Sequence, residues 1–273
     1  MVKVALVKGE RSLSTVKRAI ALAGGVNEFV DKPVLIKVNF ITTKTYETGA
    51  TTDPIVVEAL IQSIQPINKR VFVVESDATM TNAYTACELT GMQSLCDKYS
   101  VQFINLRYVK DKLKVNVPVP EALSELTLPK RVLESYVISA AKLKTHDETQ
   151  VTLGLKNMFG LLPDKFKAKF HAHGIEKVIV DINSVIKPAF TIIDGFFGME
   201  GDGPVSGKPV KMDLVIAGKD PVATDAVASK VMGFEPTSIF YIQRAAEKGI
   251  GTLENIQVVG NSIESVRRIF ERA

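Results

Sequence analysis

The sequence predicts an α/β fold, in which a mostly parallel sheet carries helices on both faces. Short β-branched runs alternate with segments of helical spacing, two Asp-Pro pairs mark helix starts, and hydrophobic residues make up 46% of the 273-residue chain, enough for a large core. We expect residues 1–273 to form a single α/β domain. The charged, proline-bearing stretch 110–131 is a hairpin or an excursion that sets a soft boundary between two closely packed lobes.

The N-terminal residues form the first expected βαβ unit. Residues 2–7 are a run of apolar and β-branched side chains that is typical of a buried strand, and residues 14–23 have the apolar spacing of a helix, which Gly24 and Gly25 end. Residues 34–40 are a second strand by the same reasoning. Because parallel strands need a crossover between them, this order favours a parallel sheet.

Two Asp-Pro pairs fix the starts of later helices. Asp53-Pro54 precedes a helix at 55–64 and Asp220-Pro221 precedes one at 222–232, since aspartate caps a helix and proline suits its first position. Further elements are expected by the same patterns: strands at 70–75, 101–105, 136–141, 190–193, 214–217 and 256–259, and a last amphipathic helix at 263–272.

The composition argues against several classes of protein. The net charge of +4 comes from 34 basic and 30 acidic residues spread along the chain, and aromatic residues make up only 7%, so no face for nucleic acid is expected. No apolar run is long enough to cross a bilayer, and the N-terminal segment, which contains Lys3 and Lys8, lacks a cleavage site, so we expect a soluble, cytoplasmic protein. Cys87 and Cys96 lack the spacing of a zinc or iron–sulfur site, so we expect no iron–sulfur cluster of its own.

Three lysines and a histidine stand beside strongly apolar neighbours in the stretches 141–146 and 151–160. They are Lys142, Lys144, Lys156 and His146. An ammonium group taken out of water loses much solvation free energy unless an anion or a set of acceptors replaces the water. The sequence therefore predicts a pocket for a small anionic molecule.

Polar side chains follow most of the predicted strands directly. These residues are Lys37, Asn39, Ser76, Asp77, Lys142, Lys144, His146 and Asp194. Because ligands of open α/β sheets lie outside the carboxyl ends of the strands, we expect these side chains to converge on one hollow. The alternative is that the lysines lie on a solvated edge of the sheet or pair with acidic residues nearby.

Lysines neutralise phosphate or carboxylate oxygens, and amides fix the orientation of a ligand without adding charge. The candidates for substrate binding are Lys37, Asn39, Thr51, Thr52, Asp77, Lys142, Lys156 and Asn157. The threonines precede an expected helix N-terminus, which favours an anion. Since the stretch 49–53 lacks both the Walker ending and the three-glycine dinucleotide fingerprint, ordinary capping by Asp53 is the favoured role there.

Lys144, His146 and Asp194 are the candidates for catalysis. Histidine titrates near neutrality, and adjacent lysines favour its neutral, proton-accepting form, although His146 would also serve as a loop hydrogen-bond partner. Asp194 begins the glycine-rich stretch 194–204, which we expect to be a loop after a strand. It is a candidate base, lysine partner or divalent-metal ligand, and the alternative for the whole stretch is a surface turn.

The remaining histidines, His171 and His173, would point to the same side if this stretch of the chain were extended. The helix that residues 164–170 indicate would turn the two rings apart, and no carboxylate stands at zinc-ligand spacing from them. A metal held by this pair is therefore the less favoured interpretation.

Several of these motifs, in this order, resemble those of the domain-of-unknown-function 362 family. The similar stretches cover nearly the whole chain and are 37–39, 51–54, 142–146, 152–160, 194–195, 199–204 and 220–226. The resemblance implies that the motifs form one site, but the family is defined by sequence and implies no particular reaction. Some members carry a cysteine-rich, ferredoxin-like segment, from which this chain departs because it has only Cys87 and Cys96.

Two functions are consistent with these residues. The first is an enzyme that acts on a small polyanionic metabolite, phosphorylated or carboxylated, with an optional divalent cation held by Asp194 and the substrate. The second is a non-catalytic ligand-binding or accessory protein for a redox or cofactor-assembly partner, which uses the same pocket. The sequence specifies neither the reaction nor the oligomeric state.

Overall fold

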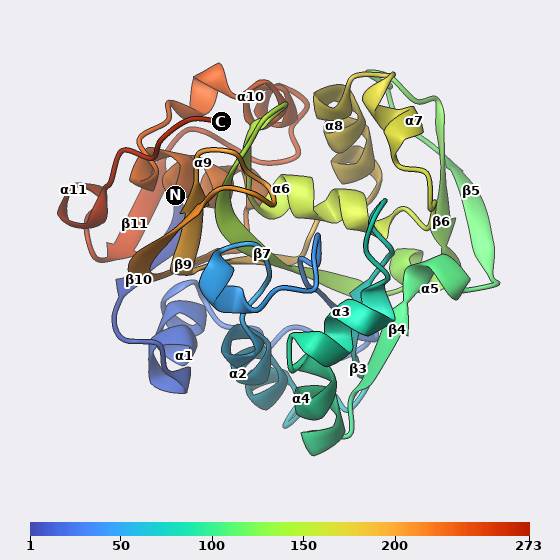
Figure 1. The fold of residues 1–273 in the computed structure, drawn as a ribbon, viewed down its shortest axis with the longest axis horizontal. Helices are drawn as coiled ribbons and strands as arrows, with labels where there is room; N and C mark the ends of the chain where they lie inside the picture. The colour runs from blue at the N-terminus through green and yellow to red at the C-terminus, as the bar shows by residue number, and fades with distance from the viewer.

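The computed structural model describes residues 1–273 and has one central sheet of nine strands (Figure 1). The strands are β1 (Val2–Lys8), β2 (Val34–Lys37), β3 (Val71–Glu75), β4 (Gln102–Asn105), β7 (Tyr136–His146), β8 (Gln150–Thr152), β9 (Phe190–Glu200), β10 (Lys208–Gly218) and β11 (Ile256–Gly260). Their order is β11-β1-β10-β9-β7-β2-β3-β4, with β8 paired to β7. β10 is antiparallel to both of its neighbours and β8 is antiparallel to β7, whereas the other pairs are parallel.

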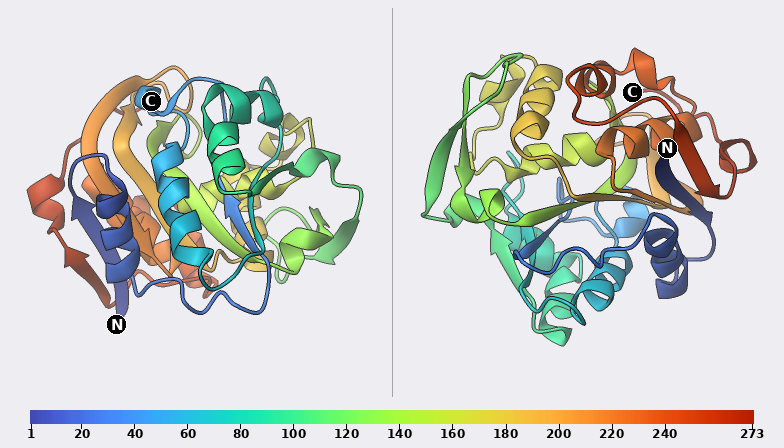
Figure 2. Two further views of the ribbon diagram at one scale, coloured as in Figure 1. Left: turned by 90° about the horizontal axis from the view of Figure 1, so that it is seen from below. Right: turned by 180° about the vertical axis from the view of Figure 1, so that it is seen from behind.

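Helices cover both faces of this sheet (Figures 1 and 2). One face carries α1 (Leu13–Leu22), α2 (Pro54–Ile64), α3 (Ala83–Leu89) and α4 (Met92–Lys98), and the other carries α6 (Gly154–Asn157), α8 (Ile175–Val185), α9 (Pro221–Val231) and α10 (Phe240–Glu247). Shorter helices are α5 (Lys130–Leu133), α7 (Ala168–His171) and α11 (Ile263–Val266). Large apolar clusters fill the space between the sheet and each helical layer. The predicted α/β class, a mostly parallel sheet with helices on both faces, is confirmed.

Both predicted Asp-Pro helix starts are present. Oδ1 of Asp53 accepts a hydrogen bond from Ile55 N at 2.9 Å, and Oδ1 of Asp220 accepts one from Ala223 N at 2.9 Å. Pro54 and Pro221 occupy the first helical positions. Each aspartate thus satisfies a backbone donor that a helix leaves free at its start.

Three strands are much longer than predicted, and one of them, β10, expected at 214–217, runs from Lys208 to Gly218. β7 continues beyond residue 141 to His146, and β9 continues beyond residue 193 to Glu200, so most of the stretch expected to be a glycine-rich loop is strand. A Cβ atom at Gly195 would lie 2.5 Å from Leu214 Cδ1, and one at Gly198 would lie 2.9 Å from Leu143 O. These glycines permit close approach of neighbouring strands rather than a turn.

Two other predicted elements are too long. The strand expected at 34–40 ends at Lys37, and Asn39 N donates to Thr52 Oγ1 at 2.8 Å instead of to a neighbouring strand. The last helix ends at Val266 instead of residue 272. Beyond it the backbone of Phe270 donates to Met232 O at 2.9 Å, which buries the phenylalanine ring against α9.

The stretch expected to be a hairpin or an excursion contains an antiparallel pair outside the main sheet. Its strands are β5 (Lys112–Asn116) and β6 (Glu125–Pro129). Leu126 and Leu128 of β6 are buried in a cluster that also contains Val178 and Ile182 of α8. None of the helices combines the length and the apolar character that a membrane span requires.

Candidate functional site

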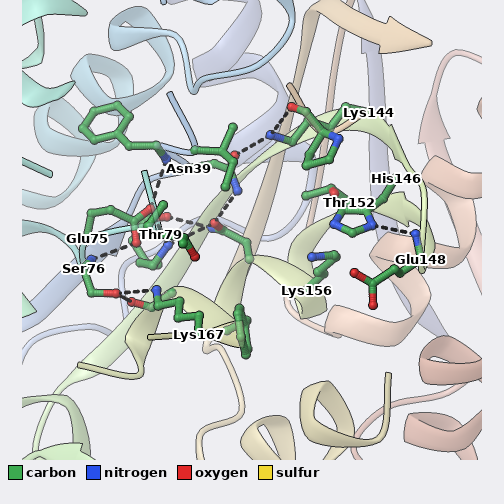
Figure 3. Close-up of a pocket in the computed structure, with 18 of the residues that line it drawn as sticks. Asn39, Glu75, Ser76, Thr79, Lys144, His146, Glu148, Thr152, Lys156 and Lys167 are labelled. Atoms are coloured by element: carbon green, nitrogen blue, oxygen red, sulfur yellow. Dashed lines mark hydrogen bonds and ion pairs between the residues drawn. The ribbon is translucent and has the colours of Figure 1, made fainter. Parts of the chain in front are cut away.

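A cavity of about 280 Å³ opens at the carboxyl ends of β2, β3 and β7. Six of the predicted site residues line it: Lys37, Asn39, Lys144, His146, Lys156 and Asn157. Figure 3 shows Glu75, Ser76 and Lys167 on one side of the cavity and His146, Thr152 and Lys156 on the other. The structure therefore brings distant stretches of the chain together around one hollow.

Lys37 forms a buried ion pair at the back of the cavity. Its Nζ lies 2.8 Å from Glu75 Oε2 and also donates to Val38 O and to Asn157 Oδ1. Burial lowers the pKa of Lys37, although Glu75 acts in the opposite direction. Gly160 lies against this pair, because a Cβ atom there would be 2.4 Å from both Lys37 Nζ and Glu75 Oε1. A side chain at this position would displace the ends of Lys37 and Glu75.

Amide groups link the lysines of the site to one another. Asn157 donates from Nδ2 to Lys37 O at 3.0 Å and accepts at Oδ1 from Asn39 Nδ2 at 3.1 Å. Asn39 in turn accepts at Oδ1 from Lys144 Nζ at 2.8 Å, and Ala50 O accepts a second bond from the same ammonium group at 2.7 Å. The two asparagines therefore hold Lys37 and Lys144 in fixed positions, and both ammonium groups keep several acceptors.

Lys156 and Lys167 have no carboxylate partner. Lys167 Nζ donates only to Ser76 Oγ at 2.7 Å, and no hydrogen bond holds Lys156 Nζ. The two ammonium groups lie 5.9 and 5.5 Å from the centre of the Phe159 ring. Burial lowers the pKa of each of these two lysines to about 8. Burial also lowers the pKa of Lys144, and the positive charges of Lys156 and Lys142 lower it further. The surroundings of these lysines thus disfavour their positive charges, which a bound anion would stabilise.

His146 is a neutral imidazole in this site. Burial, and then the charges of Lys156 and Lys144, lower its pKa to about 2. Glu148 N donates to Nδ1 at 3.1 Å, so the proton of the neutral ring is on Nε2. Asp147 Oδ1 lies 2.8 Å from Nδ1 and accepts from Glu148 N at 2.9 Å; an Nδ1–H tautomer would bond this carboxylate, so the Nε2–H assignment rests on the Glu148 contact alone. Figure 3 shows the other ring nitrogen of His146 turned toward the cavity.

The short helix α6 positions Lys156 and Asn157, and a buried carboxylate holds its first turn. Asp225 of α9 accepts from Gly154 N at 2.7 Å and from Leu155 N at 2.9 Å. Burial raises the pKa of Asp225 to about 7, although the two backbone bonds act in the opposite direction. A residue in α9 therefore fixes the orientation of a helix that lines the cavity.

Replacement of Asp225 by alanine is expected to destabilise the protein by about 2–6 kcal/mol, because two buried N–H groups lose their acceptors at about 1–3 kcal/mol each. Asp225→Asn, which keeps an acceptor for only one of the two N–H groups, should cost about half as much. Urea unfolding of both variants at one pH measures the difference in the free energy of unfolding. Equal losses for the two variants would contradict this account of the contact.

Lys142 and Asp194 lie together outside the cavity. Lys142 Nζ is 2.7 Å from Asp194 Oδ2, and both side chains are fully buried. Asp53 N donates to the same carboxylate oxygen at 2.9 Å, and Phe196 N donates to Oδ1 at 3.1 Å. Of the roles predicted for Asp194, this placement supports the lysine partner and gives no support to a catalytic or metal-binding one.

The side chains of Thr51, Thr52 and Asp77 also form hydrogen bonds within the protein. The hydroxyl groups of Thr51 and Thr52 donate to Lys44 O and Ala140 O, each at 2.8 Å. Asp77 accepts from the backbone of Ala83 at the start of α3 and pairs with an arginine and an asparagine side chain. None of the three lines the cavity, so the structure offers no ligand contact for them.

The two remaining histidines take different positions. His171 ends α7 and lies on the rim of the cavity, where its Nδ1 is 2.6 Å from Glu148 Oε1, whereas His173 follows the helix. No group of three histidine, cysteine, aspartate or glutamate side chains is arranged to hold a metal ion. The structure therefore gives no donor set for the metal that we considered at this pair or at Asp194.

Sequence reasoning missed Glu75, Thr152 and Lys167 as members of the site. A signal for Glu75 was present, since this acidic residue ends the strand beside the one that Lys37 ends. Thr152 ends β8, whose pairing with β7 places it opposite Lys144. Lys167 precedes α7 in an irregular segment, where no periodic pattern marks a buried side chain.

The fold and the site define an α/β protein with a lysine-lined cavity at the carboxyl ends of its parallel strands. Residues 34–230 match the family described as a domain of unknown function, DUF362, and the chain belongs to this family. It is 29% identical over 240 residues to a thylakoid-associated protein of Synechocystis sp., which covers 83% of this chain and 72% of that protein.

A solved structure gives a weaker likeness. The apoprotein of lactate racemase from Thermoanaerobacterium thermosaccharolyticum superposes with a TM-score of 0.43 and 13% identity, over 78% of this chain and 53% of that one. The chain thus spans about half the length of that structure.

Proposed function

We propose that this protein is an enzyme that acts on a small polyanionic metabolite, phosphorylated or carboxylated, bound in the cavity. One observation supports this most directly. Lys144, Lys156 and Lys167 line the same hollow, burial lowers the pKa of all three, and no carboxylate pairs with any of them. A bound anion would supply the missing charge and raise these pKa values again.

The size and the two-sided arrangement of the cavity restrict the ligand. A volume of about 280 Å³ lies just below the range of about 300–1,000 Å³ that is usual for drug-sized ligands. Lys167 stands on one side and Lys156 on the other, as Figure 3 shows. The site thus suits a small molecule with two separated anionic groups.

His146 is suited to donate a hydrogen bond to such a ligand. The Nε2–H group of a neutral imidazole stabilises negative charge that develops on an oxygen, which a buried neutral histidine does in other enzymes. Since Nδ1 is bonded to Glu148 N, His146 is not free to accept a proton there. The acid or base role that the sequence suggested remains a prediction, and the geometry favours the donor role.

Isothermal titration calorimetry of pyrophosphate or citrate binding tests the proposal. We expect Lys156→Met and Lys167→Met each to weaken binding by about 10- to 100-fold, because a hydrogen bond to a charged group contributes about 1.5–3 kcal/mol. Lys208→Met is the matched control, since Lys208 forms an exposed ion pair with Glu271. An unmodified protein that binds neither anion, or equal losses in all three variants, would contradict the proposal.

A second candidate is a non-catalytic protein that holds the same kind of ligand. It is favoured by the neutral state of His146 and by the bond that occupies its Nδ1. Native mass spectrometry of protein purified gently from its own host identifies a retained ligand. If the unmodified protein converts that ligand, and His146→Ala still binds the ligand but no longer converts it, the protein is an enzyme. If the unmodified protein does not convert the ligand, the protein is a binding protein.

We also propose that the protein acts in the cytoplasm. Cell fractionation tests this, with the soluble fraction as the expected location. Recovery with membranes would point instead to the association that the name of the cyanobacterial relative describes.

A further inference from the structure

Lys156 differs from the other lysines in and beneath the cavity because its amino group is free. Lys37, Lys142 and Lys144 each donate to two or three protein acceptors, and Lys167 donates to a hydroxyl group. Lys156 Nζ takes part in no hydrogen bond or ion pair, and its side chain lines the cavity. An ammonium group whose N–H bonds are taken up by several acceptors is held in its charged form, whereas a lysine without partners can lose a proton and act as a nucleophile.

We propose that Lys156 is a nucleophile that forms an imine with an aldehyde or ketone carbon of the bound anion. The inference rests on the proposed function and narrows its substrate class to anions that also carry a carbonyl group, such as 2-oxo acids or phosphorylated aldehydes. Lys144 and Lys167 would hold the anionic groups of such a ligand while Lys156 faces its carbonyl carbon.

The surroundings of Lys156 favour the amine over the ammonium ion. Burial lowers the pKa of Lys156 to about 8, and the nearby charge of Lys167 acts in the same direction, against Glu148 and Asp147. At pH 7.5 this makes the fraction of free amine on the order of 100-fold greater than for a lysine with an ordinary pKa near 10.4. The free amine is thus present at neutral pH before a ligand binds, and a ligand whose anionic groups contact Lys144 and Lys167 rather than Lys156 leaves it available.

Two polar groups beside Lys156 have hydrogen-bonding atoms without a partner in the protein. Thr152 Oγ1 is buried and has no hydrogen-bond partner, with the residue only 4% exposed. Figure 3 shows Thr152 and the His146 ring next to Lys156, and the Nε2–H group of His146 is available to donate. A carbonyl oxygen placed between them would accept these donors, and an unsatisfied buried hydroxyl would gain a partner.

The covalent step balances without any further reactant. The lone pair of Nζ forms a bond to the carbonyl carbon, and the carbonyl oxygen takes up the proton that the nitrogen loses, which gives a carbinolamine. Loss of water then leaves the carbon doubly bonded to Nζ. No oxidation or reduction takes place, and hydrolysis returns the free lysine.

Reductive trapping tests the inference. The protein is incubated at pH 7.5 with 2-oxoglutarate or with glycolaldehyde phosphate in the presence of sodium cyanoborohydride, and intact mass and peptide mapping locate the adduct. We expect one adduct per chain, on Lys156, formed at least tenfold faster than on any other lysine and suppressed by excess pyrophosphate. Adducts spread over several lysines, or none on Lys156 with either probe, would overturn the inference.

Two variants separate failure of this inference from failure of the proposed function. Lys156→Arg keeps the positive charge, so it should still bind pyrophosphate but give no adduct, whereas Lys167→Arg should still be labelled on Lys156. Anion binding by the unmodified protein without labelling of Lys156 would overturn the imine alone. Lys156 labelling that excess pyrophosphate does not suppress would overturn the shared site on which both proposals depend.

Discussion

Replacing Asp194 by asparagine is expected to lower the free energy of unfolding by about 3–5 kcal/mol, because removal of one partner of a buried ion pair leaves an uncompensated charge. The asparagine side chain keeps the shape of the carboxylate but only one acceptor oxygen, so one of the two backbone donors, Asp53 N at Oδ2 or Phe196 N at Oδ1, also loses its partner. What it lacks is the negative charge 2.7 Å from the fully buried Lys142 ammonium group. Urea unfolding at pH 7 with a constant m-value measures the loss.

A double variant provides the control for this experiment. Lys142→Met in the Asp194→Asn background removes the uncompensated ammonium group as well, so most of the lost stability should return. A double variant that is less stable than Asp194→Asn alone would contradict the assignment of the loss to a buried charge. A stable Asp194→Asn protein that has lost only turnover would restore the catalytic role that the sequence suggested for this aspartate.

Anion affinity is expected to fall as the pH rises through about 8. Burial lowers the pKa of Lys156 and Lys167 to about 8 in the ligand-free protein, and a bound anion raises both values. Above pH 8 each lysine must therefore take up a proton on binding, which weakens the affinity by up to about tenfold per pH unit for each lysine. Calorimetry with citrate in buffers of different ionisation enthalpy measures both the affinity and the proton uptake.

The same pKa values predict the opposite trend for the stability of the ligand-free protein. In the unfolded chain both lysines keep ordinary pKa values near 10.4, so between about pH 8 and 10 the unfolded state binds more protons than the folded state. These two groups then make the protein more stable as the pH rises. In thermal unfolding, the double variant Lys156→Met/Lys167→Met should gain less stability between about pH 8 and 10 than the unmodified protein. An unchanged rise would contradict the pKa assignment.

Local chemistry specified much of the fold. Asp53 and Asp220 cap the predicted helices because an aspartate followed by proline satisfies a free backbone donor and suits the first helical turn. The strand ends at residues 146 and 200 were missed because they depend on neighbouring strands. Gly195 reads as a turn residue in the sequence, yet in β9 it makes room for Leu214 of the adjacent strand.

The sequence predicted the site residues that lie at strand ends better than those that lie in irregular segments. Lys37 and Lys144 stand at or near strand ends, where the α/β rule places ligands, and both line the cavity. Asp194 follows the same pattern but pairs with Lys142, its register partner on β7, outside the cavity. Lys167 reaches the cavity from an irregular segment, and only tertiary packing determines that position.

The glycine at position 160 has a consequence for how this cavity can diversify. Because Gly160 lies against the ends of the Lys37 and Glu75 side chains, a larger residue there must displace one or both members of the ion pair. Ile41 and Thr79 also line the hollow but take no part in its lysine network, so their side chains can change in size without disturbing that network. Relatives that accept longer or bulkier ligands should therefore differ at these two positions while the glycine stays unchanged.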